Sequence, residues 1–166
     1  MPAVTMPVTV PAAPVTAAPV ATAPTPPPAP APPALLYGCM YNQDCHTLTL
    51  GCEPVAVSFP NTAPTNGVGH SRDRLLIHTA GTYEVSFEIC FSPGLSAEIT
   101  AEVTENCASL PLARQTLRAG VGRHTLMSHT ALVSLEAGAE IGLRLCADER
   151  TRADLTYAHL LLKRIG

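Results

Sequence analysis

The sequence contains no tryptophan and only three phenylalanines and four tyrosines, so any hydrophobic core must be mostly aliphatic. It has no run of 18 apolar residues, and we therefore expect no membrane insertion. The start, Met1–Val4, carries no positive charge, and prolines interrupt the apolar residues that follow, which argues against a signal peptide. We expect a protein that stays in the cell, is released by lysis, or leaves by a route that the sequence does not reveal.

The chain is also poor in clustered charge. It has 10 Lys and Arg against 13 Asp and Glu, a formal net charge of −3, and its basic residues are dispersed. Without a basic patch we expect no binding of nucleic acid. No cysteine, serine or carboxylate is arranged with a histidine in a pattern that indicates an activated nucleophile. We expect no enzymatic activity, no catalytic residue, no metal and no cofactor.

Residues 1–36 lack both charge and glycine and hold twelve of the 17 prolines. Proline fixes φ and removes a backbone donor, so this segment cannot form a helix or a central strand. The composition predicts an extended, polyproline-II-like stalk or linker. A simple spacer, a ligand for an aromatic-lined groove, and a tail that anchors the protein in a larger surface assembly all fit this composition.

Residues 37–52 are predicted to be a short, flexible junction that carries Cys39, Cys45 and Cys52. A zinc site usually begins with two cysteines separated by two to four residues, and this spacing is absent. If copies of the chain assemble, an odd number of cysteines on this segment would suit disulfide cross-links between neighbouring chains. Pairing within one chain and free thiols remain open alternatives.

Residues 53–166 are predicted to form one all-β head. In 83–91, apolar and polar residues alternate strictly, which is the period of a strand with one buried face. Similar stretches separated by turn residues predict further strands at 54–59, 74–78, 98–104, 114–118, 124–135, 140–146 and 155–165. The fold class we predict is an antiparallel jelly-roll sandwich preceded by the extended Pro-rich segment.

The last predicted strand is apolar on both faces. Strict alternation places Leu155 on the same side as Tyr157. A strand of this kind either lies in the centre of a sandwich or is covered by another subunit. The interface candidates are Tyr157, His159, Leu160, Leu161 and Leu162.

Other reactive or charged side chains have simpler expected roles. Cys107 lies at a predicted hairpin tip and is the best candidate for an exposed thiol, whereas Cys90 and Cys146 are expected to fill the core. His78 is expected at an interface or in the core. In the loop 148–154, three acidic residues cluster near Arg150 and Arg152, and we expect local salt pairs there in preference to a calcium site.

Several local elements occur together in the head. Phe59 precedes a loop, Ala80–Tyr83 opens a long alternating strand, Ala137–Leu143 forms a turn and strand, and an apolar strand ends the chain. In this combination residues 53–166 resemble the tumour-necrosis-factor-like jelly roll, in the branch of the complement-type globular heads. The closest resemblance is to the C-terminal domain of bacterial collagen-like glycoproteins of the exosporium, the outer spore surface.

The resemblance implies a ten-strand jelly roll, a homotrimer, and a non-enzymatic structural or adhesive role. It also implies display on a spore surface or an extracellular appendage, where the partners would be copies of the chain itself and a surface glycan or protein ligand. The alternative is the receptor-binding head of a phage fibre or an adhesin. In that case the loops 60–73 and 147–154 are where we expect a ligand pocket.

Overall fold

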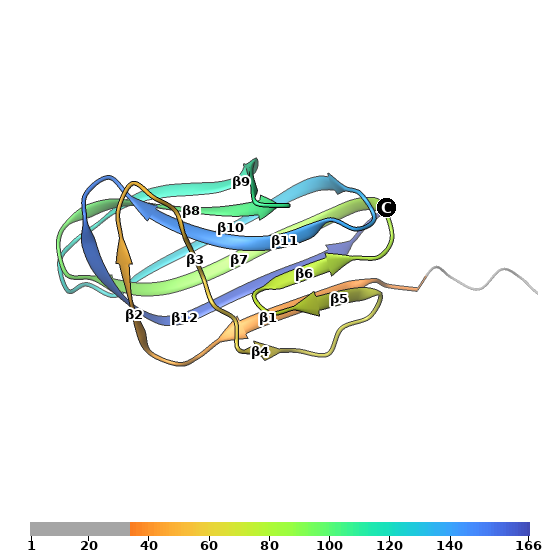
Figure 1. The fold of residues 1–166 in the computed structure, drawn as a ribbon, viewed down its shortest axis with the longest axis horizontal. Helices are drawn as coiled ribbons and strands as arrows, with labels where there is room; N and C mark the ends of the chain where they lie inside the picture. The colour runs from red at the N-terminus through yellow and green to blue at the C-terminus, as the bar shows by residue number, and fades with distance from the viewer. Residues whose placement is uncertain (1–33) are drawn as a thin grey trace, which may run out of the picture. The chain divides into compact units, whose positions relative to one another are not determined.

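The computed structural model describes residues 34–166, and the predicted stalk lies outside these residues except for its last three. The described part consists of strands and turns (Figure 1). Its strands are β1 (Tyr37–Asn42), β2 (His46–Leu50), β3 (Val55–Ala56), β4 (Asn61–Thr62), β5 (Val68–Ser71), β6 (Arg74–Ile77), β7 (Gly81–Pro93), β8 (Ala97–Glu105), β9 (Ala108–Ala119), β10 (Thr125–Leu135), β11 (Glu140–Ala147) and β12 (Thr151–Arg164). No helix in this part of the chain is long and apolar enough to cross a membrane.

The strands form two antiparallel sheets, which confirms the predicted sandwich. One sheet has the order β10-β7-β12-β1-β4, with β2 also paired to β12. The other has the order β5-β6-β11-β8-β9, with β3 also paired to β11. Apart from the hairpins β5–β6 and β8–β9, neighbouring strands are far apart in sequence, so non-local pairing of the β7–β12 kind determines most of the architecture.

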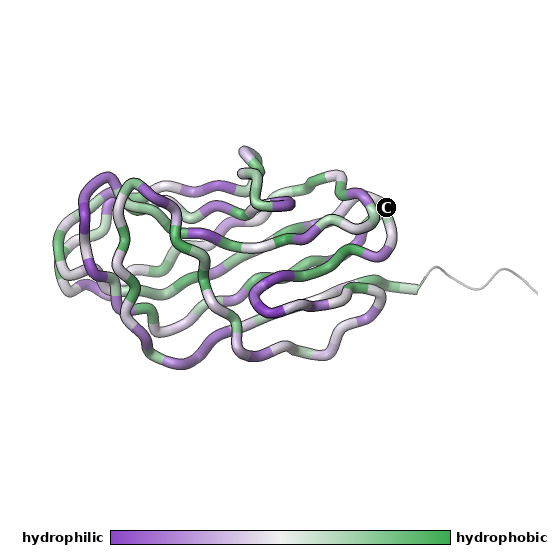
Figure 2. Tube along the Cα trace, viewed as in Figure 1, coloured by the Kyte–Doolittle hydropathy of each residue, from purple (hydrophilic) through white to green (hydrophobic). Residues whose placement is uncertain are grey.

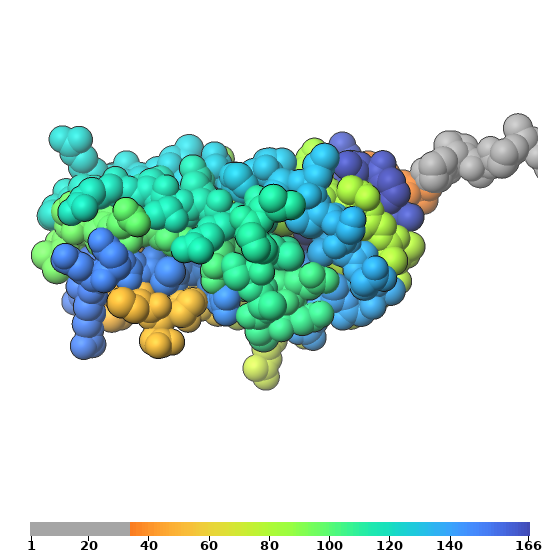
Figure 3. Space-filling view, turned by 90° about the horizontal axis from the view of Figure 1, so that it is seen from above, coloured from red at the N-terminus to blue at the C-terminus, as the bar shows by residue number. Residues whose placement is uncertain are grey.

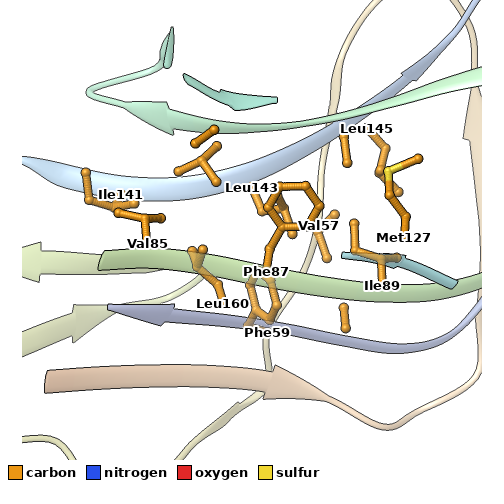
Figure 4. Close-up of a cluster of buried hydrophobic side chains, with 14 of the residues drawn as sticks. Val57, Phe59, Val85, Phe87, Ile89, Met127, Ile141, Leu143, Leu145 and Leu160 are labelled. Carbon is orange, nitrogen blue, oxygen red and sulfur yellow. The ribbon is translucent and has the colours of Figure 1, made fainter. Parts of the chain in front are cut away.

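The core lies between the sheets and is mostly aliphatic, as the composition predicts. On β7 the alternating residues Tyr83, Val85, Phe87, Ile89 and Phe91 are all buried. Figure 4 shows Phe87 and Ile89 of β7 directed toward side chains of the facing sheet. Burying one such side chain contributes about 2 kcal/mol, so this single strand accounts for a large part of the stability.

Residues 37–52 differ from the predicted flexible junction because they are part of the head. Strand β1 pairs with the second half of β12, with Cys39 opposite Leu161, and β2 pairs with its first half, with Thr49 opposite Arg152. The alternation of half-buried and buried residues in β1 ends in a buried polar residue, Asn42, whose amide donates to the Ser58 carbonyl at 2.9 Å. Because a polar residue occupies a core position at the end of β1, the hydrophobic pattern of the sequence did not predict this strand.

Strand β12 contains an irregularity that strict alternation missed. The register with β7 shifts between Leu155 and Tyr157, so Leu155 is buried while Tyr157 is on the outer face. Leu160 and Leu162 are fully buried in the core of the single chain. These two leucines are therefore unavailable for contact with another subunit, which corrects their prediction as interface residues.

The head has two distinct ends (Figure 1). Ala34 and the C-terminus lie at one end, which we call the base. The turns β7–β8, β9–β10 and β11–β12 meet at the other end, which we call the tip; there the amide of Gly94 donates to the Arg152 carbonyl at 2.7 Å, and Gly122 to Pro93 at 2.8 Å. Figure 2 shows that the β11–β12 turn at the tip is largely hydrophilic.

Candidate self-association face and cysteine positions

The outer face of the sheet that contains β1, β12 and β7 carries an unusual set of side chains. Pairing places Tyr41, His159 and Glu88 in one row across these strands, and Cys39, Leu161 and Ser86 in the next row. These side chains are half-buried although no other element within residues 34–166 covers them. We call this surface the tyrosine face; it comprises Tyr37, Cys39, Tyr41, Ser86, Glu88, Cys90, Tyr157, His159 and Leu161.

The centre of the tyrosine face is a pair of aromatic rings. The hydroxyl of Tyr157 lies 2.9 Å from Nδ1 of His159, and the two rings meet edge-on at 5.6 Å between centroids. Burial lowers the pKa of His159, and the nearby carboxylate of Glu88 opposes this effect. Burial also raises the pKa of Tyr157, as do the charges of Glu88 and Cys39. Without a partner, these groups already occupy a partly dehydrated surface.

The sheet edge next to this face carries two exposed leucines, which are separated by the exposed Ser128 and Thr130. On β10, Leu126 and Leu132 are 59% and 55% exposed, respectively. They point outward from the same sheet, Leu126 opposite Cys90 and Leu132 opposite Glu84. Aromatic residues are enriched at the centres of protein interfaces, and apolar side chains exposed beside them extend such a surface. The arrangement suits contact with another protein surface.

Sequence reasoning identified Tyr157, His159 and Leu161 on this face but missed Tyr37 and Tyr41. The missed residues lie on β1, which alternates with period two over only six residues. Three of the four tyrosines of the chain share this one face. The short alternation Tyr37–Cys39–Tyr41 was the signal that could have placed them there.

The three cysteines of the N-terminal strands are too far apart to pair within one chain. Cys39 is half-buried on the tyrosine face, whereas Cys45 and Cys52 are exposed at either end of β2. An extended strand advances about 3.3 Å per residue, whereas disulfide-bonded Cα atoms are less than about 7 Å apart. Burial raises the pKa of the Cys39 thiol. Of these three cysteines, Cys45 and Cys52 are the two that are exposed to solvent.

Cys107 is exposed at the tip of the β8–β9 hairpin, at the predicted position. Both turn residues have positive φ, 51° for Asn106 and 69° for Cys107, which cysteine adopts with strain. The guanidinium of Arg74 donates to the Cys107 sulfur at 3.2 Å, and Arg144 donates to the Cys107 carbonyl at 3.1 Å. These two contacts from neighbouring strands hold the strained turn.

Cys90 and Cys146 do not fill the core as predicted. Both are half-buried on the outward faces of their strands, because the intervening residues Ile89, Phe91 and Leu145 occupy the core positions. Burial raises the pKa of the Cys146 thiol, and the charge of Glu102 adds to this effect.

The charged loop 148–154 differs from the predicted set of local salt pairs. The carboxylate of Asp148 accepts from the Glu98 amide at 2.8 Å, and that of Asp154 from the Thr47 hydroxyl at 2.6 Å. Across residues 34–166 the ion pairs are Arg74–Glu140 and Arg144–Glu102, so Arg150 and Arg152 have no carboxylate partner there. His78 is exposed. No group of three potential metal ligands occurs in the described part of the chain.

Comparison with known proteins bears on the fold. No family model matches the sequence, and no curated protein matches it. Among solved structures, Eiger TNF from S. frugiperda superposes with a TM-score of 0.64 at 12% identity, covering 80% of this chain and 93% of that chain. The globular domain of zebrafish complement 1qA gives 0.57 at 13% identity over 80% and 98% of the two chains.

Murine APRIL superposes with a TM-score of 0.51 at 8% identity, covering 78% of this chain and 99% of that chain. The three structures are nearly fully covered, so the head corresponds to a whole domain in each of them. Identities this low establish the fold alone. The predicted jelly-roll class is confirmed, and the described part of this chain has the fold of the TNF-like and complement-type globular heads.

Proposed function

We propose that the protein is a non-enzymatic structural protein whose head assembles into a homotrimer through the tyrosine face. The observation that carries this proposal is a half-buried outer sheet face with three tyrosines and Leu161, next to the exposed Leu126 and Leu132 at the sheet edge. In a ring with threefold symmetry, the edge of one head would cover the face of the next. The resemblance to TNF-like heads supports three as the number that closes the ring.

The trimer would bury charge as well as apolar surface. Glu88 and His159 lie side by side in one row, so a neighbouring subunit would cover a carboxylate and an imidazole together with the apolar side chains. Native mass spectrometry of the full chain tests the proposal. It should detect a species of three times the 17.4-kDa chain mass, and a monomer at micromolar concentration would refute it.

We further propose display on a bacterial spore or cell surface, with the Pro-rich segment as the stalk. The supporting features are the uncharged, proline-dense residues 1–36 followed by a head of this fold. Antibody labelling of intact spores and cells, with the outer layers stripped as a control, tests this location. Labelling found only after cell lysis would argue against it.

Disulfide cross-links between assembled chains form a third part of the proposal. The exposed Cys45 and Cys52 suit links between neighbouring trimers, because accessible thiols can meet when particles touch. Cys39 on the tyrosine face suits a link inside the trimer only if three copies of the face approach closely. Non-reducing electrophoresis of C39S and of the C45S/C52S double variant separates these two cases.

A second function, the receptor-binding head of a phage fibre or an adhesin, is favoured by one observation. The tip has a hollow of about 420 Å³ that is lined by residues of the 147–154 loop region, including Arg150 and Arg152. Binding of the full chain to intact host cells or to a purified surface glycan would favour this function over a purely structural one.

A further inference from the structure

The hollow at the tip is built by three segments that are distant in sequence. Its lining consists of Thr49, Gly94, Leu95, Arg150, Thr151 and Arg152. Pairing of Thr49 with Arg152 aligns β2 and β12 along one side. The β7–β8 turn supplies the other side, and in Figure 3 the segments around residues 50 and 150 lie together at the end away from the base. Its volume is within the range of small-molecule sites.

The floor of this hollow is held in place by hydrogen bonds. The amide of Gly94 donates to the Arg152 carbonyl at 2.7 Å, and the amide of Leu95 donates to the Thr151 hydroxyl oxygen at 3.1 Å. Thr151 is buried, so its hydroxyl is committed to the floor. A ligand would therefore meet a preformed surface, which reduces the entropic cost of binding.

The hollow is positively charged on a chain whose net charge is −3. Arg150 and Arg152 line it, and no acidic residue does. Of the nearby carboxylates, Asp148 and Asp154 accept hydrogen bonds from the Glu98 amide and the Thr47 hydroxyl, and the exposed Glu149 and Glu53 form no ion pair among the described residues. Within residues 34–166 neither arginine forms an ion pair, and a guanidinium is the side chain best suited to grip a carboxylate with two parallel hydrogen bonds.

We propose that the tip hollow binds a carboxylate-bearing sugar, a ligand class that deepens the proposed function of a displayed head. Arg150 and Arg152 bind the carboxylate, and the exposed hydroxyl of Thr49 meets a sugar hydroxyl. Leu95, which is 55% exposed, packs against the apolar face of the ring. A peptide fits less well because it relies on backbone hydrogen bonds, and the Arg152 carbonyl at the hollow is already bonded to Gly94.

Assembly would strengthen a weak site. A single shallow contact of this kind has a Kd on the order of 1 mM, and three tips on one trimer would gain by multivalency when the sugar is presented on a polymer or a surface. Free sugar therefore reports on the single site, whereas a polymer of uronic acid reports on the site and the assembly together.

The test is a ligand-observed NMR titration of the full chain with glucuronate, with glucose as the neutral counterpart. We expect saturable binding of glucuronate, at least tenfold weaker binding of glucose, and a tenfold loss of glucuronate affinity in the R150Q/R152Q double variant. R118Q removes an exposed arginine of β9 outside the hollow and should bind as the unmodified chain does. Circular dichroism of both variants verifies their folding.

Equal binding of glucuronate and glucose, or unchanged binding in folded R150Q/R152Q, would overturn the proposal. Tighter binding of the acidic dipeptide N-acetyl-aspartyl-leucine than of glucuronate would overturn the assignment to a sugar. The mass of each sample, measured in parallel, separates the two levels of the account. A trimer that does not bind glucuronate contradicts only the tip site, and a monomer that binds it contradicts only the trimer.

Discussion

The hydroxyl of Tyr157 and Nδ1 of His159 form a 2.9 Å hydrogen bond on the outer face of β12, where residues two positions apart in sequence point to the same side. Nδ1 can accept this bond only while the imidazole is neutral. Partial burial lowers the pKa of His159 and so favours that neutral form, and Glu88 in the same row opposes it. The charge on this surface is thus sensitive to mild acid.

Acidification should lower the stability of the folded head because burial lowers the pKa of His159. The unfolded chain takes up a proton as the pH falls through the ordinary histidine pKa of 6.5, whereas the folded chain takes it up only at lower pH. Stability is therefore present above pH 6.5 and is lost as the pH falls from there to the lower folded-state pKa. Urea unfolding between pH 7.5 and 5 checks this.

The variant H159Q should flatten that decline, and H124Q, which changes an exposed histidine, should leave it intact. The groups that face His159 on its own sheet are Tyr157, Tyr41 and Glu88. An equally steep loss of stability in H159Q would show that another group controls the acid response.

A charge placed on the tyrosine face should prevent assembly. L161E puts a carboxylate in the row between Cys39 and Ser86, where a neighbouring subunit would have to bury it at a cost of several kcal/mol. We expect sedimentation velocity to find monomers with an unchanged β-sheet spectrum. The matched variant R118E, on the other sheet, should remain a trimer; dissociation of both variants alike would contradict the assignment of the face.

The core of β7 should be sensitive to truncation. Phe87 is 1% exposed between the sheets, so F87A should lower the free energy of unfolding by about 3–5 kcal/mol. S86A changes the adjacent outward-facing residue and should alter it by less than about 0.5 kcal/mol. Urea denaturation of both variants gives the comparison, and similar losses would mean that the two faces of β7 are wrongly assigned.

The two ion pairs should differ in their contribution to stability. Arg144 donates to Glu102 at 2.7 Å, and the Glu102 side chain is only 9% exposed, with a second hydrogen bond from Ser109. R144M would leave this carboxylate without its ion-pair partner and should lower the free energy of unfolding by about 2–3 kcal/mol. R74M removes the more exposed pair with Glu140 and should cost about 1 kcal/mol or less. In thermal unfolding, the midpoint temperature of R144M should be well below that of R74M.

The cysteines should react in an order determined by burial. Alkylation requires the thiolate, and burial raises the pKa of the Cys39 thiol. Iodoacetamide at pH 7.5 should therefore modify the exposed Cys45, Cys52 and Cys107 before Cys39, as measured by peptide mass spectrometry over time. Labelling of Cys39 as fast as Cys45 would show that the tyrosine face is more accessible than the structure indicates.

Periodicity in the sequence predicted β7 and β10 well, because each buries one face along many residues. The alternating stretch 83–91 lies within β7, and 124–135 is β10 with one residue fewer, whereas only 114–118 of the long β9 was predicted. Short strands were missed: β4 and β5 lie in the expected loop 60–73, where two to four residues are too few to display a period. The pairing of β4 with β1 depends on contacts that local sequence does not encode, whereas β5 pairs with the adjacent β6 as a tight hairpin.

The candidate face was predicted only in part for a related reason. A bulge at Leu155–Tyr157 changes which side chains point outward, and no residue in that stretch predicts the bulge. Strict alternation therefore grouped Leu155 with Tyr157. The tip hollow forms where β2, the β7–β8 turn and the start of β12 meet, so sequence could indicate the region 147–154 but could not place Thr49 and Leu95 beside it.

The most direct test of the central claim is the light-scattering mass of the full chain, with and without reductant. The account predicts three times the 17.4-kDa chain mass under reducing conditions, and larger species only when reductant is absent. A mass of one chain at micromolar concentration would contradict assembly through the tyrosine face. A trimer that dissociates on reduction would contradict non-covalent assembly and leave the disulfides as its cause.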